Sequence, residues 1–341
     1  MSIIMTGGGT GGHLAIVRAV KEELRGEKII YIGSVSGQDR AWFENDSDFE
    51  KKYFLQTRGV VNQGILGKIK SLWMLARAVV ESYNIIKQEG VKVVFCVGGF
   101  SAAPASIASI LARVPLVIHE QNAIIGSLNK RLAKYAKVFI SSYSNNSPIK
   151  SYPVKKEFFN MARTRKNVKT ILFLGGSQGS LAINNLAIAL APWLSSENIK
   201  IVHQAGVKNI DNVKARYEEI GVDAEVFGFA NNMSEIMSNA DIAIARSGAS
   251  TLWELCANNL PSIFIPYPYA AGDHQFFNAK FLVEQELAFV FRENEINTDT
   301  IKNIIKDSKN LEIKSKALKS TIDKNGSRQI AELLLNMSNK G

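Results

Sequence analysis

The chain has 341 residues, 46% of them hydrophobic and 21% charged, which is typical of a folded protein with room for two domains. Its net charge of +10 suits phosphorylated or anionic partners, but no zinc-finger, RNP-type or basic–aromatic pattern is present, so nucleic acid is not an expected partner. No apolar run reaches the ~18 residues that a membrane-spanning helix needs. Two cysteines, Cys96 and Cys256, lie in apolar stretches without metal-ligand spacing, so we expect buried thiols, a reducing compartment and no metal site.

Short apolar strands alternate with helical segments, beginning with a strand at 3–5 and a helix at 14–24. This alternation predicts an α/β protein with two Rossmann-like, doubly wound parallel sheets, in which loops after the strands bind ligands. A stretch rich in Ser, Asn, Lys and Pro at 144–169 marks a linker, and we place the domain boundary near residue 157. Further predicted strands are 28–32, 91–97, 116–119, 137–141, 170–174, 199–204, 224–227, 241–245 and 262–266, and further helices are 69–87 and 181–194.

The loop after the first strand reads GGGTGGH over residues 7–13. Glycines let the backbone approach a ligand closely, and the amino end of the following helix favours an anion. The pattern is neither G-x-G-x-x-G nor a Walker A sequence. A structural turn is the alternative, but five glycines followed by His13 favour a functional loop.

Two further motifs follow predicted strands in the first half. Gly98-Gly99-Phe100 either holds a phosphate or forms a close-packed turn, and the sequence leaves both open. The residues HEQN at 119–122 end an apolar strand, so their polar side chains are expected at a site that recognises the hydroxyls of a sugar or of an acceptor. Asn122 is the best candidate there, whereas His119 is expected to be a hydrogen-bonded supporting group rather than the catalyst.

The second half repeats the pattern of strand, glycine turn and helix, with GGSQG at 175–179. The segment RSGASTLWE at 246–254 begins a helix, so Ser250 and Thr251 are expected near an anion. Glu254 either completes a capping box or accepts two hydroxyls of a ribose. The segment DHQFFNA at 273–279 is either an ordinary helix start or part of the site.

Six motifs, in order over nearly the whole chain, resemble the MurG family of glycosyltransferases: GGGTGGH, GGF, HEQN, GGSQG, RSGA and DHQ-x-x-NA. That family transfers N-acetylglucosamine from UDP-N-acetylglucosamine to undecaprenyl-pyrophosphoryl-muramoyl-pentapeptide (lipid I), giving lipid II. The resemblance implies a GT-B fold with two domains facing a cleft, and no metal or organic cofactor. It implies an acceptor and membrane-associating domain at 1–157, a donor domain at 158–325 and a last helix at 326–341 that returns to the first domain.

The resemblance also implies roles for single residues. Ser177 is expected on the diphosphate, the backbone of Ala230 on uracil, and Asn122 and Gln275 on the sugar. Where the family commonly has an arginine, this chain has Lys155, which keeps the charge but loses a planar, bidentate group. The remaining expected donor-site residues are Thr10, Gly11, Gly12, Ala249, Ser250, Thr251, Leu252, Trp253 and, on ribose, Glu254.

The expected reaction is a direct displacement in which the acceptor 4-hydroxyl attacks the anomeric carbon and inverts it. His13 is the candidate base, because a histidine pKa can be tuned near the operating pH. The alternatives are that His13 only stabilises the loop and positions the acceptor, or that Glu120 is the base.

A hydrophobic and basic segment is a candidate membrane patch at the cytoplasmic face of the inner membrane. Helical periodicity alone favours packing in the core, whereas the resemblance favours contact with anionic lipid. The remaining functional alternatives are another GT-B enzyme, such as a glycolipid transferase or a UDP-N-acetylglucosamine 2-epimerase, and a non-catalytic nucleotide-sugar-binding subunit. The patch comprises Ile65, Leu66, Lys68, Ile69, Lys70, Leu72 and Trp73, with Arg77 one turn further on.

Overall fold

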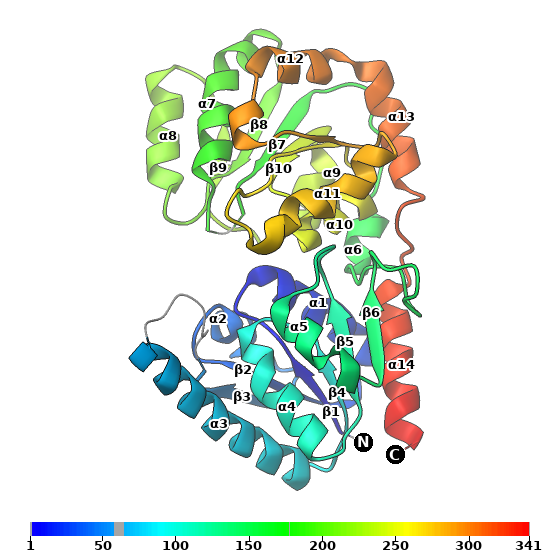
Figure 1. Cartoon of the computed structure of the whole chain (residues 1–341). Helices are drawn as coiled ribbons and strands as arrows, with labels where there is room; N and C mark the ends of the chain where they lie inside the picture. The colour runs from blue at the N-terminus through cyan, green and yellow to red at the C-terminus, as the bar shows by residue number, and fades with distance from the viewer. Residues whose placement is uncertain (1, 58–64, 177, 341) are drawn as a thin grey trace. The chain divides into compact units, whose positions relative to one another are not determined.

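The structure, a computed structural model, describes residues 2–57, 65–176 and 178–340. The chain divides into two compact units (Figure 1). Unit 1 comprises Met1–Lys155 and Asn325–Gly341, and unit 2 comprises Lys156–Lys324. Each unit is a parallel sheet with helices on its faces, which confirms the predicted α/β class.

The sheet of unit 1 has six parallel strands in the order β3-β2-β1-β4-β5-β6. Its central strand β1 is entirely buried, as expected where helices cover both faces of a parallel sheet. The strands are β1 Ser2–Thr6, β2 Lys28–Ser34, β3 Lys51–Leu55, β4 Val91–Cys96, β5 Leu116–Glu120 and β6 Val138–Ser141. The helices are α1 Gly11–Lys21, α2 Asp39–Phe43, α3 Ile65–Gln88, α4 Ala103–Leu111, α5 Ser127–Leu132 and α14 Gly326–Lys340.

The sheet of unit 2 has the order β12-β11-β10-β7-β8-β9. Its core gathers aliphatic side chains from the sheet and from the helices packed on it, among them Ile171, Leu190 and Ile305. The strands are β7 Thr170–Leu174, β8 Lys200–Gln204, β9 Glu225–Phe227, β10 Ile242–Ala245, β11 Ser262–Phe264 and β12 Phe289–Val290. The helices are α6 Lys156–Asn160, α7 Leu181–Ser196, α8 Ile210–Glu219, α9 Met233–Asn239, α10 Ala249–Ala257, α11 His274–Glu284, α12 Thr298–Lys306 and α13 Ser308–Leu318.

Both sheets share one topology, because each runs third, second, first, fourth, fifth and sixth strand from edge to edge. In such a sheet the strand order reverses between the first and fourth strands, and ligands bind beyond the carboxyl ends of the strands at that point. The reversal lies between β1 and β4 in unit 1 and between β7 and β10 in unit 2. The loops that follow these four strands are therefore the natural place for a site.

The helix α14 belongs to unit 1 although it ends the chain (Figure 1). Its Ile330 and Leu334 are fully buried, and the Ser327 hydroxyl donates to the Val154 carbonyl at 3.1 Å. At Gly326 a side chain would collide with the carbonyls of Ser151 and Tyr152, which explains a glycine at the first position of the helix.

The entry into unit 2 is fixed by a buried arginine. The guanidinium of Arg165 donates to the carbonyls of Met237 and Ala240 at 2.9 and 3.1 Å and to the side chain of Asn258 at 2.5 Å. Burial lowers the pKa of Arg165 to about 9. The segment predicted as a linker thus contains a short helix, α6, and an anchor for the ends of α9 and α10.

Candidate functional site

The glycine loop after β1 leads straight into α1, which begins at Gly11. The expected helix start at residue 14 is wrong by three residues, because Gly11, Gly12 and His13 already form the first turn. Gly9 has φ +83°, a backbone conformation that glycine adopts without strain. The last residues of the glycine loop therefore form the first turn of α1. The N–H groups of a first turn have no partner within the helix, so they are suited to bind an anion.

A buried carboxylate, which the sequence analysis did not single out, holds this loop in place. Asp39 is fully buried and accepts hydrogen bonds from the Gly9 N–H at 2.7 Å, the Tyr31 hydroxyl at 2.9 Å and the Ser34 N–H at 3.2 Å. The Tyr31 hydroxyl also contacts the Gly7 carbonyl at 2.8 Å. Burial, followed by the nearby Asp39 charge, raises the pKa of Tyr31 well above its usual range.

The second glycine pair packs on the first. The Gly8 N–H donates to the Gly98 carbonyl at 3.3 Å, and a side chain on Gly99 would overlap the Gly8 carbonyl. Gly98 and Gly99 have φ values of +89° and +80°. Of the two roles left open by the sequence, the structure supports the close-packed turn.

Glu120 organises the loop that follows β5. Its Oε1 accepts the Asn122 N–H at 2.9 Å, and its Oε2 accepts the Gly126 N–H and the Asn129 Nδ2 at 2.9 Å each. The side chain is 1% exposed. A carboxylate whose two oxygens already accept three hydrogen bonds is better suited to hold Asn122 in place than to remove a proton.

Both ring nitrogens of His13 contact polar side chains. Nδ1 lies 2.8 Å from Thr10 Oγ1, and Nε2 lies 2.9 Å from the amide nitrogen of Gln121. The structure thus brings together two predicted residues, His13 and Thr10, with a glutamine of the HEQN motif that was not among the candidates. Gln121 is nearly buried, and its signal in the sequence was only its place between Glu120 and Asn122.

His119 lies behind this group and is fully buried against the edge of the Tyr152 ring, with centroids 5.5 Å apart. Neither ring nitrogen has a hydrogen-bond partner among the residues that the structure describes. Burial, with a smaller contribution from nearby His13, lowers the pKa of His119 to about 3, so the ring is neutral at physiological pH. The expectation of a hydrogen-bonded supporting group is therefore wrong among the described residues, while the burial of the ring argues against a catalytic role.

Lys155 lies at the end of the first segment of unit 1 and pairs with Glu22 at 3.0 Å. The Lys155 side chain is 25% exposed and that of Glu22 is 30% exposed. The positive charge expected to contact the donor therefore has a carboxylate partner in unit 1.

In unit 2 the glycine turn after β7 packs on the loop after β8. The Gly175 N–H donates to the Gln204 carbonyl at 3.1 Å, and side chains on Gly179 or Gly206 would collide with the facing loop. The Ser180 hydroxyl caps α7 by accepting the Ile183 N–H at 3.3 Å. The candidate Ser177 lies outside the described residues.

The helix after β10 begins at Ala249, with Gly248 as its N-cap. A capping box at Glu254 is excluded, because this residue lies in the second turn rather than three residues after the cap. Leu252 and Trp253 are buried, and the Trp253 ring stacks on Phe281 with centroids 4.9 Å apart. The side chains of these two candidates thus pack in the core, whereas Thr251 and Glu254 are partly exposed.

Two motifs of unit 2 are tied to the loops beside them. Arg246 donates to the carbonyls of Ile265 and Pro266 at 2.9 Å each and pairs with Glu293 at 2.5 Å. Gln275 accepts the Tyr267 N–H at 2.9 Å through its Oε1. Both side chains therefore shape the segment after β11, beside which α11 begins.

Ala230 lies in the loop after β9 and is partly exposed. Its neighbour Phe229 is 51% exposed. This loop follows the third strand of unit 2, at the same carboxyl edge of the sheet as the turns after β7 and β8.

The exposed face of α3 is apolar in its first half. Ile69, Leu72 and Trp73 are each more than 60% exposed, as is Val80, and the cations Lys70 and Arg77 lie on the surface among them. Packing in the core, the role that periodicity alone favours, is therefore wrong for these side chains. The side chains of Ile65, Leu66 and Lys68 lie outside the described residues.

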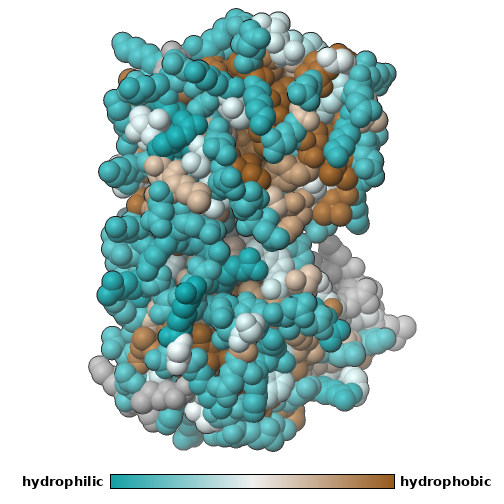
Figure 2. All heavy atoms as spheres, turned by 180° about the vertical axis from the view of Figure 1, so that it is seen from behind, coloured by the Kyte–Doolittle hydropathy of each residue, from teal (hydrophilic) through white to brown (hydrophobic). Residues whose placement is uncertain are grey.

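Exposed apolar residues also occur on unit 2, for example Leu181 and Tyr269, and Figure 2 shows hydrophobic residues on the rear face of that unit. What distinguishes α3 is the spacing of its exposed apolar residues, which places them on one face of one helix. No helix in the described part of the chain is long and apolar enough to cross a bilayer.

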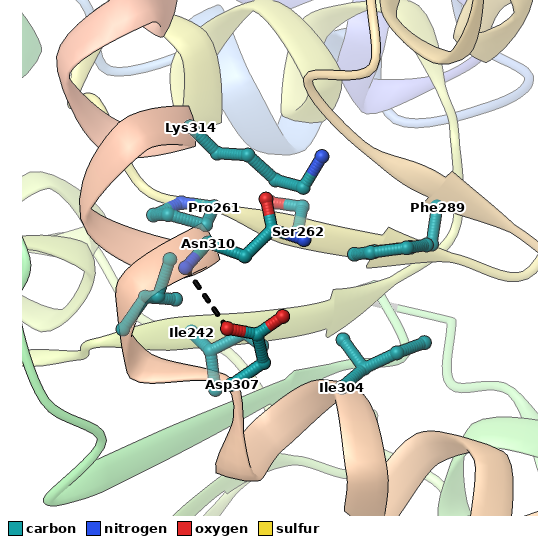
Figure 3. A pocket seen from close by; sticks show the side chains of 9 residues that line it. Ile242, Pro261, Ser262, Phe289, Ile304, Asp307, Asn310 and Lys314 are labelled. Carbon is teal, nitrogen blue, oxygen red and sulfur yellow. Dashed lines mark hydrogen bonds between the residues drawn. The ribbon is translucent and has the colours of Figure 1, made fainter.

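A small pocket in unit 2 lies away from these loops (Figure 3). It is lined by Ile242, Ser262 and Phe289, the first residues of β10, β11 and β12, and by Asp307 and Lys314. The pocket thus lies at the amino-terminal edge of the sheet, opposite the edge where the glycine turns lie. Within the described ranges, no cluster of His, Cys, Asp and Glu forms a metal site.

Two family models match the chain. The model of the glycosyltransferase family 28 N-terminal domain matches residues 3–140, and that of the C-terminal domain of the same family matches residues 170–334. Together they cover both sheets.

Two relatives that match over nearly their full length carry the name UDP-N-acetylglucosamine--N-acetylmuramyl-(pentapeptide) pyrophosphoryl-undecaprenol N-acetylglucosamine transferase. The relative from Sulfurovum sp. (strain NBC37-1) is 59% identical over 98% of this chain and 99% of its own length. A relative from Campylobacter jejuni (strain 81116) is 50% identical over 98% of both.

The solved structure of Acinetobacter baumannii MurG is 25% identical and matches with a TM-score of 0.80, covering 98% of this chain and 99% of that one. The UDP-GlcNAc 2-epimerase from Neisseria meningitidis, bound to UDP-GlcNAc, matches with a TM-score of 0.64 at 13% identity, covering 98% of this chain and 100% of that one. At that identity the second match shows a shared fold alone.

Proposed function

The chain belongs to glycosyltransferase family 28, and on that premise we propose that it transfers N-acetylglucosamine from UDP-N-acetylglucosamine to the muramoyl sugar of lipid I. The products are lipid II and UDP, and the pathway served is peptidoglycan synthesis. One observation carries the proposal: 59% identity, over nearly the full length of both chains, to a transferase named for this reaction.

The donor side of the proposal rests mainly on unit 2. Among the residues proposed to follow the nucleotide sugar, Ala230 lies in the loop after β9, those from Ala249 to Glu254 lie in the first turns of α10, and Gln275 lies at the start of α11. Helix amino ends there are suited to the charge that UDP gains as it leaves. The proposed donor contacts in unit 2 are Ser177, Ala230, Ala249, Ser250, Thr251, Leu252, Trp253, Glu254 and Gln275, with Leu252 and Trp253 contributing through their backbone.

Unit 1 is proposed to receive the acceptor and to add donor contacts. These donor contacts are Thr10, Gly11 and Gly12, in the loop and first turn of α1, and Asn122, whose N–H donates to Glu120. In the proposed step the acceptor 4-hydroxyl attacks the anomeric carbon, its proton passes to His13, and UDP leaves with inversion. The contacts of Glu120 support His13 rather than Glu120 as the base. Lys155 is retained as a proposed donor contact through its positive charge, and its ammonium group is paired with Glu22.

Turnover and folding together test this assignment. We expect His13→Ala to lower kcat by about 100-fold or more with little change in stability, because it removes the base. Glu120→Gln should instead lower the urea midpoint, because an amide N–H would face a backbone N–H that now donates to the carboxylate. Near-normal turnover in His13→Ala would overturn the base assignment.

A membrane site completes the proposal, because lipid I is carried in a bilayer. The exposed apolar face of α3, with Lys70 and Arg77, supports peripheral binding to an anionic surface at the cytoplasmic face of the inner membrane. Lysine and arginine gain electrostatic energy near such lipids while the apolar side chains enter the interface.

Release of UDP in the presence and absence of a lipid I analogue separates this function from its rivals. The proposed transferase releases UDP only with the acceptor. A 2-epimerase converts the donor sugar without any acceptor, and a non-catalytic subunit binds the donor without turnover. Either of those two results would contradict the proposal.

A further inference from the structure

The contacts of His13 define which of its nitrogens can act. Nδ1 faces a hydroxyl, Thr10 Oγ1, which can either donate or accept. Nε2 faces the amide nitrogen of Gln121, which can only donate. With this orientation of the amide, the ring accepts at Nε2 and donates from Nδ1.

The surroundings of Gln121 support this orientation. Its Oε1 is buried and has no hydrogen-bond partner among the described residues. If the amide were turned over, the buried position would hold an NH₂ group with two unsatisfied hydrogens instead of one unsatisfied carbonyl oxygen. Buried donors without partners are rarer in folded proteins than carbonyls that lack one, so the observed orientation is the better one for a neutral ring.

We propose that Gln121 is a positioning residue that fixes His13 as the tautomer with hydrogen on Nδ1 and so reserves the Nε2 lone pair for the acceptor hydroxyl. This inference rests on the proposed function of His13 as the base. The arrangement is local to unit 1, because all three residues lie in its loops and in the first turn of α1.

The same glutamine also has a place after proton transfer. The acceptor hydroxyl takes the position of the Gln121 N–H at Nε2, its oxygen bonds to the anomeric carbon, and its proton remains on Nε2 while UDP carries away the electron pair of the broken bond. The imidazolium ring then has hydrogens on both nitrogens. A half-turn of the Gln121 amide brings the unpartnered Oε1 to Nε2, where it accepts that hydrogen.

Nitrogen NMR of histidine-labelled protein tests the proposal without relying on activity, because ¹⁵N shifts separate the two neutral tautomers and the charged ring. The chain has four histidines, so His13→Gln assigns the signal by its loss. We expect the Nδ1–H tautomer in the wild type. Gln121→Glu, whose carboxylate only accepts, should convert His13 to a ring protonated at Nε2, and Gln121→Met should leave a mixture.

The control is Gln88→Glu, the same change at an exposed position at the end of α3, and it should leave the signal unchanged. We expect kcat to fall about 10-fold or more in Gln121→Glu while the KM for the donor stays within about twofold, because the ring loses its basic Nε2. An Nε2–H tautomer in the wild type, or one tautomer shared by the wild type and both Gln121 variants, would overturn the proposal. If His13→Ala keeps its turnover but the tautomer shifts as expected, the base assignment fails and the positioning by Gln121 stands.

Discussion

The carboxylate of Asp39 accepts the backbone N–H of Gly9 at 2.7 Å, thirty residues away in the sequence. Because Asp39 also accepts the Tyr31 hydroxyl and the Ser34 N–H, one buried side chain joins the glycine loop to the end of β2. The shape of the loop is thus set by a side chain that is fully buried.

Replacing Asp39 should loosen the loop and destabilise unit 1. We expect Asp39→Ala to lower the free energy of unfolding by about 2 kcal/mol or more, because the N–H groups of Gly9 and Ser34 lose their acceptor, whereas the Tyr31 hydroxyl keeps the Gly7 carbonyl. Urea unfolding gives the midpoint and slope. The exposed Asp223 provides the control, and Asp39→Ala unfolding at the same midpoint as Asp223→Ala would contradict the inferred role.

A pair of glycines separates close packing from backbone strain. Gly99 has φ +80° and faces the Gly8 carbonyl, whereas Gly90 has φ +59° with open space where a side chain would lie. We expect Gly90→Ala to cost about 1 kcal/mol through strain alone, and Gly99→Ala to cost clearly more and to reduce turnover, because the loop must move. Thermal unfolding and UDP release measure both. If Gly90→Ala and Gly99→Ala lowered stability and UDP release equally, the packing of Gly99 on Gly8 would not be the reason why glycine is needed at position 99.

Acid should destabilise the protein through His119. Burial lowers its folded pKa to about 3, against about 6.5 in the unfolded chain. Between these two pKa values His119 binds a proton in the unfolded chain but stays neutral in the folded chain. The free energy of unfolding therefore falls as the pH falls from 6.5 towards 3, and it does not change with this residue above pH 6.5. We expect the free energy of unfolding of His119→Phe to be close to that of the wild type at pH 7.5. Between pH 6.5 and 3 the variant should become more stable than the wild type by up to about 1.4 kcal/mol for each unit by which the pH falls.

His203 supplies the contrasting case. It is equally buried, but its nitrogens contact Tyr217 Oη and Asn184 Oδ1 at 3.0 Å each. His203→Phe should therefore already cost about 2 kcal/mol at pH 7.5, because two buried partners are left unpaired. Urea unfolding at several pH values measures the stability of both variants. If His119→Phe and His203→Phe lost the same free energy of unfolding at pH 7.5, the hydrogen bonds of His203 would not account for its stability contribution.

Substitutions on α3 test membrane binding. We expect Leu72→Ser/Trp73→Ser to bind vesicles containing anionic lipid at least about tenfold more weakly, because two exposed apolar side chains leave the interface. Soluble turnover and thermal stability should not change. The matched control is Ile313→Ser on α13 of unit 2, whose side chain is 58% exposed. Vesicle binding that is unchanged in the double variant, or lost equally in the control, would argue against the α3 face.

The α/β class and most strands could be predicted from alternating apolar runs, because buried parallel strands give nearly continuous hydrophobic segments. The edge strands β3 and β12 could not. β3 begins with two lysines and has one buried residue, and β12 has only two residues, so neither carries a strong pattern. Their places come from pairing with β2 and β11, which is a property of the folded sheet.

The candidate loops could be predicted from their glycines, but the residues that hold them could not. Asp39 and Gln121 act across long sequence separations, and neither stands in a pattern that marks a buried partner. Likewise, Leu72 and Trp73 have the spacing of a core helix face, and only the packing of α3 on α4 reveals that they lie on the other side.

The position of α14 has a consequence for how the protein is made. Unit 1 contains the first and the last residues of the chain, and α14 packs on α1 and on β1 and β4 at the centre of its sheet. During synthesis on the ribosome, unit 2 can fold before α14 is made. Most of unit 1 is translated first, but it still lacks the helix that packs on α1, β1 and β4. Unit 1, which is proposed to bind the lipid, is therefore the unit that completes its fold last.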